Sequence, residues 1–179
     1  EESQIVRDYR FIEENTGGII PIDVVIRFSV EDRASVEDGL LFVERQEIVR
    51  RIQRRMIDEH SDISGSLSLA TFRPEVDAAE IERVARNPFL RKVELTKDDQ
   101  VLQNESARHF VTLGTEDADR LVPGDHGLCE KDDELWRITA QVNIMTVVNV
   151  DALTADIDNI VQEEMKNVAG GNHVVTGIV

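Results

Sequence analysis

The side chains best suited to bind a metal lie in one acidic stretch of the chain. His126 and Cys129 form an isolated His-x-x-Cys pair, and Asp125 stands directly before the histidine. Further carboxylates follow closely, at Glu130, Asp132 and Asp133. A metal held there would have a loose, oxygen-rich coordination. An ordinary polar turn explains the same residues more simply, so we predict no metal site.

Motifs for nucleophilic catalysis or nucleotide binding are equally sparse. Serines alternate along a predicted strand at positions 64, 66 and 68, and no Gly-x-Ser-x-Gly elbow contains them. Gly17-Gly18 precedes a strand and no Lys-Ser or Lys-Thr follows it, which excludes a P-loop. No sequence neighbour suggests general-base chemistry for His60, His109 or His173. We therefore predict that the chain is not an enzyme and has no cofactor, and the pattern identifies no substrate-binding residue.

Composition narrows the classes of partner. The chain has 179 residues, of which 41% are hydrophobic, enough for one domain with a sizeable core. A formal net charge of −16 excludes sequence-independent binding to nucleic acid and a polybasic contact with anionic lipid. Cys129 is the one cysteine, so no internal disulfide can form. Residues 94–134 carry twelve acids and four bases, which is half of the excess charge.

Hydrophobic periodicity predicts alternating strands and helices. From Ile20 to Val30 every even position is apolar, which indicates a strand with one buried face. A helix is expected from an N-cap at Ser35 to about His60, and a shorter one from Asp77 to Asn87. The remaining elements are a strand with Ile63, Leu67 and Leu69 on one side, a strand over residues 136–144, a helix capped by Asp151 and closed by Gly170-Gly171, and a strand from His173.

The long first helix carries two stripes of different character. Its apolar stripe is predicted to face the core and consists of Leu41, Ile48, Val49, Ile52 and Met56. Beside it lies an arginine cluster at positions 50, 51, 54 and 55, with Glu44 and Glu47 one turn earlier. We interpret the cluster as a solvated face with pairs between successive turns, and an anion or headgroup site is the alternative. Trp136 is expected in the core.

The order of elements predicts an α+β fold. Two β-α-β halves joined by an insertion are typical of the ferredoxin-like split β-α-β sandwich, with helices on one face of a mostly antiparallel sheet. The other face would carry Arg27, Thr139, Gln141 and Asn143. We predict one domain over residues 1–179, with a lead-in segment over 1–16 and an irregular, partly helical insertion over 71–133. Within this insertion, residues 102–113 fit a helix or a strand.

Phrases near both ends of the chain resemble those of a known family. The first is Tyr9-Arg10-Phe11-Ile12-Glu13-Glu14-Asn15, followed by Gly17-Gly18, Pro21 and Val24-Val25-Ile26. The second runs from Trp136-Arg137-Ile138 into Asp151-Ala152-Leu153 and ends at Val174-Val175-Thr176-Gly177. Together they resemble the first extracytoplasmic loop of RND-superfamily exporters, in the MMPL or patched-like branch. The likeness does not extend across residues 88–133.

The resemblance implies a location and a role. The domain would lie on the extracytoplasmic (periplasmic) side of the cell membrane, as a porter domain of a proton-driven exporter of hydrophobic or lipid-like compounds. Its partners would be the transmembrane helices, a second extracytoplasmic loop and the substrate, and a homo-oligomer of the full-length protein is compatible with this. The family's proton-relay acids lie in transmembrane helices, so no residue of this chain inherits that role.

The apolar end of the sequence, residues 174–179, leads us to expect a piece of a longer chain. Two other functions stay open at this point. One is a stand-alone ferredoxin-like ligand-binding or regulatory module that dimerises through its sheet. The other is an enzyme that uses the acidic stretch around His126 as a metal site.

Overall fold

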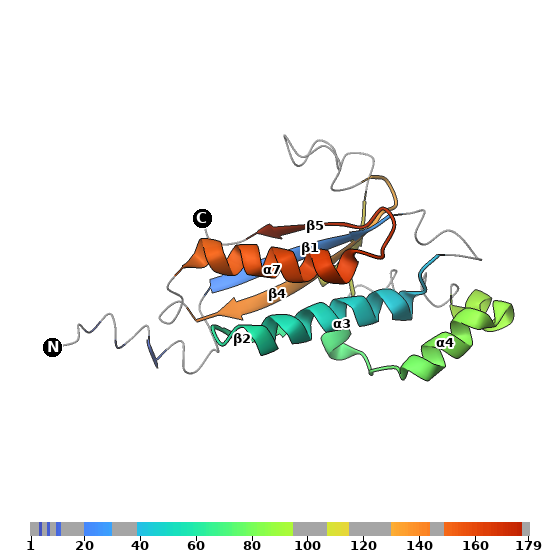
Figure 1. The fold of residues 1–179 in the computed structure, drawn as a ribbon, viewed down its shortest axis with the longest axis horizontal. Coiled ribbons are helices and arrows are strands. Elements are labelled where there is room, and N and C mark those ends of the chain that lie inside the picture. Colours follow the sequence, from blue (N-terminus) through green and yellow to red (C-terminus); the bar gives the residue numbers. More distant parts are fainter. Residues whose placement is uncertain are drawn as a thin grey trace.

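An antiparallel sheet with helices packed on one face forms the core of the protein (Figure 1). The computed structural model describes residues 20–29, 39–94, 107–114, 130–143 and 149–176, together with Gln4, Arg7, Arg10 and Phe11. The strands are β1 (Ile20–Phe28), β2 (Ile63–Leu67), β3 (Val111–Leu113), β4 (Glu134–Val142) and β5 (Asn172–Thr176). The α-helices are α3 (Phe42–Glu59), α4 (Ala78–Arg86) and α7 (Val150–Met165), and short 3-10 helices are η1 (Leu69–Phe72) and η2 (Ala107–His109).

Strand β4 organises the sheet. On one side it pairs with β1 along its whole length. On its other side it pairs with β2 at residues 139–142 and with β3 at residues 134–136. The order is β2–β4–β1–β5, with every pairing antiparallel. It follows that β1 runs parallel to β2 with β4 between them, and β4 runs parallel to β5 with β1 between them.

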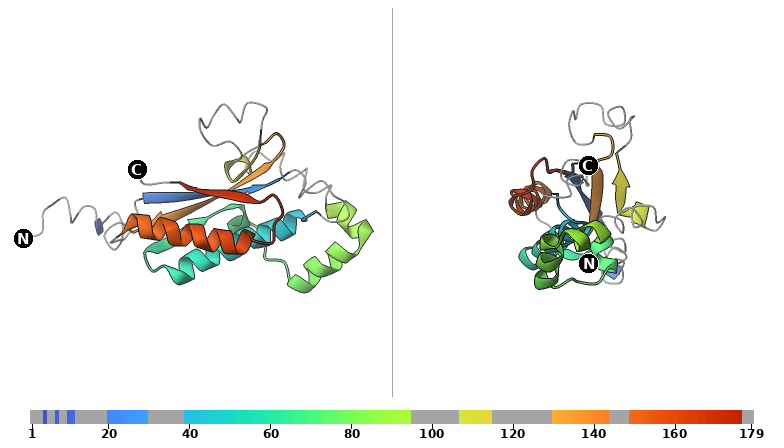
Figure 2. Two further views of the ribbon diagram at one scale, coloured as in Figure 1. Left: turned by 45° about the horizontal axis from the view of Figure 1, so that its top comes forward. Right: turned by 90° about the vertical axis from the view of Figure 1, so that its right-hand side faces the viewer.

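The period-two pattern of β1 and β4 has the predicted result. Even positions of β1 are fully buried at Ile22, Val24, Ile26 and Phe28, and so are Trp136, Ile138 and Ala140 of β4. Figure 2 shows α3 and α7 on one side of the sheet, and their apolar residues belong to the same core. The predicted α+β class, with helices on one face of an antiparallel sheet, is therefore confirmed. Trp136 lies in the core, as expected.

Helix α3 ends where the sequence predicts but begins later. Its apolar stripe is buried from Leu41 to Met56, and His60 is the C-cap. The predicted N-cap at Ser35 lies outside the described residues, and residues 39–41 are not helical. The start is set instead by Glu44, whose carboxylate accepts a hydrogen bond from the amide of Leu41 at 2.6 Å. The charge of Glu44 also suits the positive end of the helix.

Of the three predicted inward positions of the second strand, Ile63 and Leu69 are buried, and the prediction for Leu67 is wrong. A register shift between Ile63 and Gly65 reverses the face of the sheet to which the later side chains of β2 point. Leu67 consequently stands opposite Thr139 on the face away from the helices and is 41% exposed. Leu69 does not continue the strand, because it begins η1.

Helix α7 has a different cap from the predicted one. The side chain of Asn149 accepts a hydrogen bond from the amide of Ala152 at 3.0 Å, so Asp151 lies in the first turn. The predicted closure at Gly170-Gly171 is wrong, because the helix ends at Met165 with Lys166 as its C-cap. Gly170, which has a φ of 67°, lies in the turn that leads to β5. At Gly171 a Cβ atom would come within 2.7 Å of the Cε atom of Met165.

The region predicted as an irregular insertion contributes to the sheet. Strand β3 follows η2 and pairs with β4, so residues 102–113 include both a helical turn and a strand in their described part. The predicted cap of α4 is confirmed, since Asp77 accepts from the amide of Ala79 at 2.9 Å. Helix α4 stops at Asn87, whose side chain then caps a new helical segment over residues 88–94. Helix α4 has no buried residue and lies beside the N-terminal end of α3, away from the sheet (Figure 1).

A buried ion pair joins the helical layer to the sheet. Arg45 of α3 and Glu134 of β4 are 1% and 0% exposed, and their Nε and Oε2 atoms lie 2.8 Å apart. The indole Nε1 of Trp136 donates to the same carboxylate at 2.9 Å, and Arg45 also donates to the carbonyl oxygen of Leu40. Each charge thus has several partners that offset its loss of water.

We expect Glu134→Gln to lower the free energy of unfolding by about 3–5 kcal/mol, because Arg45 would remain buried without a counter-charge. The double variant Arg45→Met/Glu134→Leu should recover much of that loss, since it removes both charges together. Urea denaturation measures both. Arg83→Gln, which removes an exposed pair with Glu80, serves as the control and should change stability little. A Glu134→Gln variant as stable as the control would contradict this account.

Candidate functional site

An aromatic pair, one ring exposed and the other half-buried, lies where η1 meets the residue before β3. The ring centroids of Phe72 and Phe110 are 5.4 Å apart, and Phe72 is 64% exposed. The carbonyl oxygen of Phe110 accepts a hydrogen bond from the amide of Arg137 at 2.7 Å, which places Phe110 at the edge of β4. We define the aromatic–arginine patch as Leu67, Phe72, Phe110, Arg108 and Arg137.

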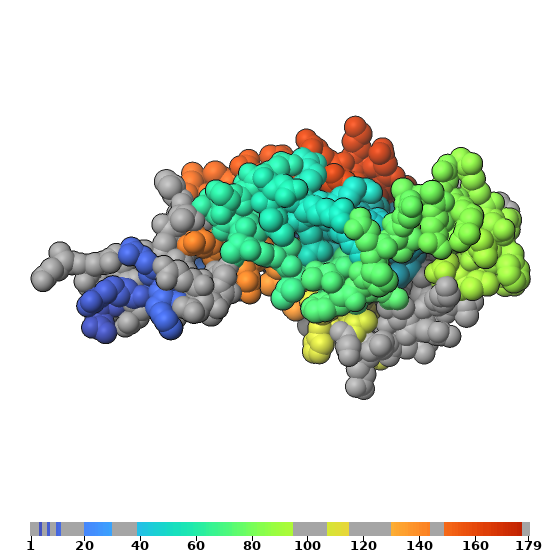
Figure 3. All heavy atoms as spheres, turned by 90° about the horizontal axis from the view of Figure 1, so that it is seen from below, coloured from blue at the N-terminus to red at the C-terminus, as the bar shows by residue number. Residues whose placement is uncertain are grey.

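The patch lies along the edge of β4 where β2 ends and β3 begins. Arg137 and Thr139 alternate with buried Ile138 along β4, so they point to the opposite face. Leu67 pairs with Thr139 and lies on that face as well. Phe110 lies beside Arg137 and is half-buried, because it also packs against the core. In Figure 3 the yellow segment 107–114 lies against the green segment that follows β2.

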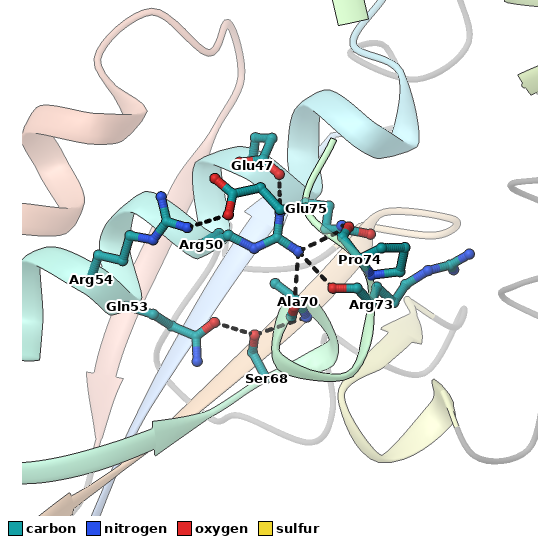
Figure 4. A network of polar contacts seen from close by, with 10 residues as sticks. Glu47, Arg50, Gln53, Arg54, Ser68, Ala70, Arg73, Pro74 and Glu75 are labelled. Atoms are coloured by element: carbon teal, nitrogen blue, oxygen red, sulfur yellow. Dashed lines mark hydrogen bonds and ion pairs between the residues drawn. The ribbon is translucent and has the colours of Figure 1, made fainter. Parts of the chain in front are cut away.

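Arg50 fixes the segment that presents Phe72. Its guanidinium is buried and donates to the carbonyl oxygens of Ala70 and Arg73, each at 3.0 Å, while that of Pro74 lies 3.3 Å away (Figure 4). Glu47 pairs with the same guanidinium from the preceding turn of α3. The interpretation of Arg50 as part of a solvated face is therefore wrong, because its partners are backbone carbonyls that lie far along the chain.

A second polar contact from α3 holds the start of the same segment. The hydroxyl of Ser68 donates to Oε1 of Gln53 at 2.6 Å and accepts from the amide of Ala70 at 3.0 Å. Gln53 Nε2 donates to Ser66 Oγ and Thr71 Oγ1, both at 3.1 Å. These bonds fix the turn that follows β2. Phe72 is therefore exposed on a backbone segment that hydrogen bonds from α3 hold in place.

The other arginines of the predicted cluster pair with acids. Arg51 contacts Glu164 of α7 at 2.8 Å, and Arg55 contacts Glu59 at 2.7 Å. Across the described chain, carboxylates pair with Arg27, Arg45, Arg50, Arg51, Arg54, Arg55, Arg83 and Arg86. Exposed Arg108 and Arg137 pair with no carboxylate in the part of the chain that the structure describes. Among the described residues, the positive charge of these two arginines therefore has no carboxylate partner.

The end of the acidic stretch next to β4 is held to β1 by an ion pair. Asp133 is fully buried and contacts Nε of Arg27 at 2.5 Å, while Glu130 lies 3.5 Å from the same guanidinium. The amide of Gly114 donates to the carbonyl oxygen of Asp133 at 2.8 Å. The candidate metal ligands Asp125, His126 and Cys129 lie outside the described residues. Within the described ranges, no group of three or more His, Cys, Asp or Glu side chains is placed to hold a metal.

The remaining chemistry-bearing residues have structural partners. Ser64 donates to the carbonyl oxygen of Gln141 at 3.1 Å, and His173 contacts Asp158 of α7 at 2.9 Å. His60 is the C-cap of α3, and His109 is the last residue of η2. Sequence reasoning missed the patch because Phe72 and Phe110 stand outside the periodic segments. The signal in the sequence that could have indicated the patch is the presence of these two large aromatic residues in segments that are otherwise polar and aperiodic.

No family model, curated protein or solved structure matches this chain. Among the helices in the described ranges, none combines the length and apolar character needed to cross a bilayer. The chemistry of the patch is therefore argued from its geometry alone.

We expect Arg50→Met to lower the free energy of unfolding by about 1–3 kcal/mol, because buried carbonyl groups lose their donor. Hydrogen exchange at the amides of Ala70 and Thr71 should accelerate with it. The matched control is Arg54→Met, one turn later, which removes only an exposed pair with Glu75. Equal protection of Ala70 and Thr71 in both variants would show that Arg50 does not hold this segment.

The pKa of Glu75 lies below its ordinary value, because Arg54 donates a hydrogen bond to the carboxylate and adds a nearby positive charge. A depressed pKa gives a stabilising contribution that is present above the ordinary pKa of glutamate and is lost as the pH falls through the lowered value. We expect Arg54→Gln to raise the pKa of Glu75 toward its ordinary value. Glu59, whose pKa is lowered by Arg55, should not change. Carbon-detected NMR titration measures both carboxyls, and an unaltered Glu75 would contradict the pair.

Proposed function

We propose that the chain is an extracytoplasmic porter-type domain of a proton-driven RND-superfamily exporter of the MMPL or patched-like branch. The observation that carries this proposal is the resemblance of phrases near both ends, from Tyr9 to Ile26 and from Trp136 to Gly177. The domain would contribute to the path of hydrophobic or lipid-like compounds. Its partners would be the transmembrane helices and a second extracytoplasmic loop.

The strand order supports this proposal. In the first half of the chain α3 connects the parallel strands β1 and β2, and β4 lies between them. In the second half α7 connects the parallel strands β4 and β5, and β1 lies between them. We propose that this is the ferredoxin-like split β-α-β arrangement. The resemblance implies β-α-β modules for porter domains, so the two lines of reasoning agree. One fold serves many functions, so the strand order supports the architecture and leaves the cargo to other observations.

The role of the domain would be conformational. Substrate would pass between this domain and a second loop, and rigid-body rocking of the two would alternate access to the path. Proton transfer would take place in the membrane segments of the parent protein. The open sheet face, with the aromatic–arginine patch at its edge, is the surface through which the domain would meet its cargo.

The parent gene provides the decisive test. We expect about 30 residues on each side of this chain to include a run of roughly 20 apolar residues, long enough to span a bilayer. Sequencing the flanking DNA measures this directly. Stop codons or polar sequence on both sides would overturn the exporter proposal. That result would favour the competing function, a stand-alone ferredoxin-like ligand-binding or regulatory module.

A further inference from the structure

We propose that the aromatic–arginine patch binds single molecules of an anionic amphiphile, a compound with an apolar chain and one anionic head. The apolar chain would lie over Leu67, Phe72 and Phe110, and the head would pair with Arg137. This inference names the cargo chemistry and the contact surface of the proposed porter domain, and in that respect it rests on the proposed function.

The apolar half of the site is formed by two exposed side chains, Leu67 and Phe72, and by the half-buried ring of Phe110. Phe72, the last residue of η1, is 64% exposed, and Leu67, the last residue of β2, is 41% exposed. The ring of Phe110 packs on Phe72 at 5.4 Å, so the two rings form one surface. The bonds from Arg50 and Gln53 hold this surface in place without a ligand. Rigid apolar surfaces lose little entropy when they bind.

The charged half of the site is formed by two exposed arginines, Arg108 and Arg137. Arg137 projects from the open face beside Phe110, and Arg108 lies two positions before Phe110 in η2. Neither pairs with a carboxylate among the described residues. In a chain with 36 acids and 20 bases, two exposed arginines that pair with no described carboxylate provide, beside the Phe72–Phe110 pair, a local complement to a negative head.

The net charge of the chain favours a single amphiphile over a membrane surface. An anionic bilayer presents many charges to the whole protein and is repelled by its net charge of −16. One small head group responds mainly to charges within a screening length of about 8–10 Å, so an adjacent arginine side chain affects it more than the net charge of distant parts of the chain. A cationic amphiphile would meet the same arginines with the wrong sign.

The test is NMR titration of the full 179-residue chain with dodecanoate below its micelle concentration. We expect saturable chemical-shift changes at the amides of Leu67, Thr112 and Arg137. Dodecyltrimethylammonium, which has the same alkyl chain and the opposite charge, should leave these amides unchanged. Isothermal titration calorimetry gives the dissociation constant for each variant.

Matched variants separate the patch from general hydrophobic binding. Phe72→Ala should weaken dodecanoate binding about five-fold, since it removes the main exposed ring. Phe89→Ala removes a ring that is 74% exposed on the far helical segment and should have no effect. Arg137→Gln should weaken binding about two- to five-fold, whereas Arg83→Gln makes the same change in net charge and should not.

Each result decides the inference. Equal losses in Phe72→Ala and Phe89→Ala, or equal patch shifts with the cationic amphiphile, would overturn it. So would co-flotation with phosphatidylglycerol vesicles in the absence of dodecanoate binding, which would assign the patch to a bilayer surface. Failure of dodecanoate to bind refutes only this inference, because the exporter proposal is judged separately by the flanking sequence.

Discussion

The contact between Arg45 and Glu134 determines how the helices sit on the sheet. It joins α3 to the end of β4, and β4 is the strand that pairs with β1, β2 and β3. Because two buried charges are costly apart, the helix cannot slide along the sheet without separating them. Trp136 completes the arrangement by donating to the same carboxylate, so the aromatic core and the ion pair share one geometry.

Helix α3 uses a second set of buried polar side chains to organise the chain beyond β2. Gln46, Arg50 and Gln53 recur at intervals of three or four residues and are buried, which places them on one side of the helix. Arg50 and Gln53 bind the carbonyl and hydroxyl groups of residues 66–74, and Gln46 donates to Pro74 at 3.3 Å. A single helix therefore packs against the sheet with apolar groups and against the following segment with polar ones.

The sequence predicts those parts of the fold that depend on short-range periodicity. The strand pattern of β1, the apolar stripe of α3 and the cap at Asp77 all act within a few residues, so each could be read directly. The turning over of β2 could not, because a bulge has no periodic signature. The burial of Arg50 depends on carbonyl groups that only the folded chain brings near it.

One signal for the buried pair was nevertheless present in the sequence. The inward positions of β4 are even-numbered, and Glu134 occupies one of them ahead of Trp136 and Ile138. A carboxylate at a core position requires a buried cation, and the arginine-rich helix was the obvious source.

The patch differs from much of the described surface in how its arginines are paired. The excess of acids over bases means that exposed arginines readily find carboxylates, as Arg51 and Arg55 do between α3 and α7. Among the described residues Arg108 and Arg137 have no such partner, and Phe110 is the neighbour of Arg137 at this edge. Covering the apolar groups of the patch and neutralising the arginines are separate sources of binding free energy, and one ligand can supply both only if it is itself amphiphilic and anionic.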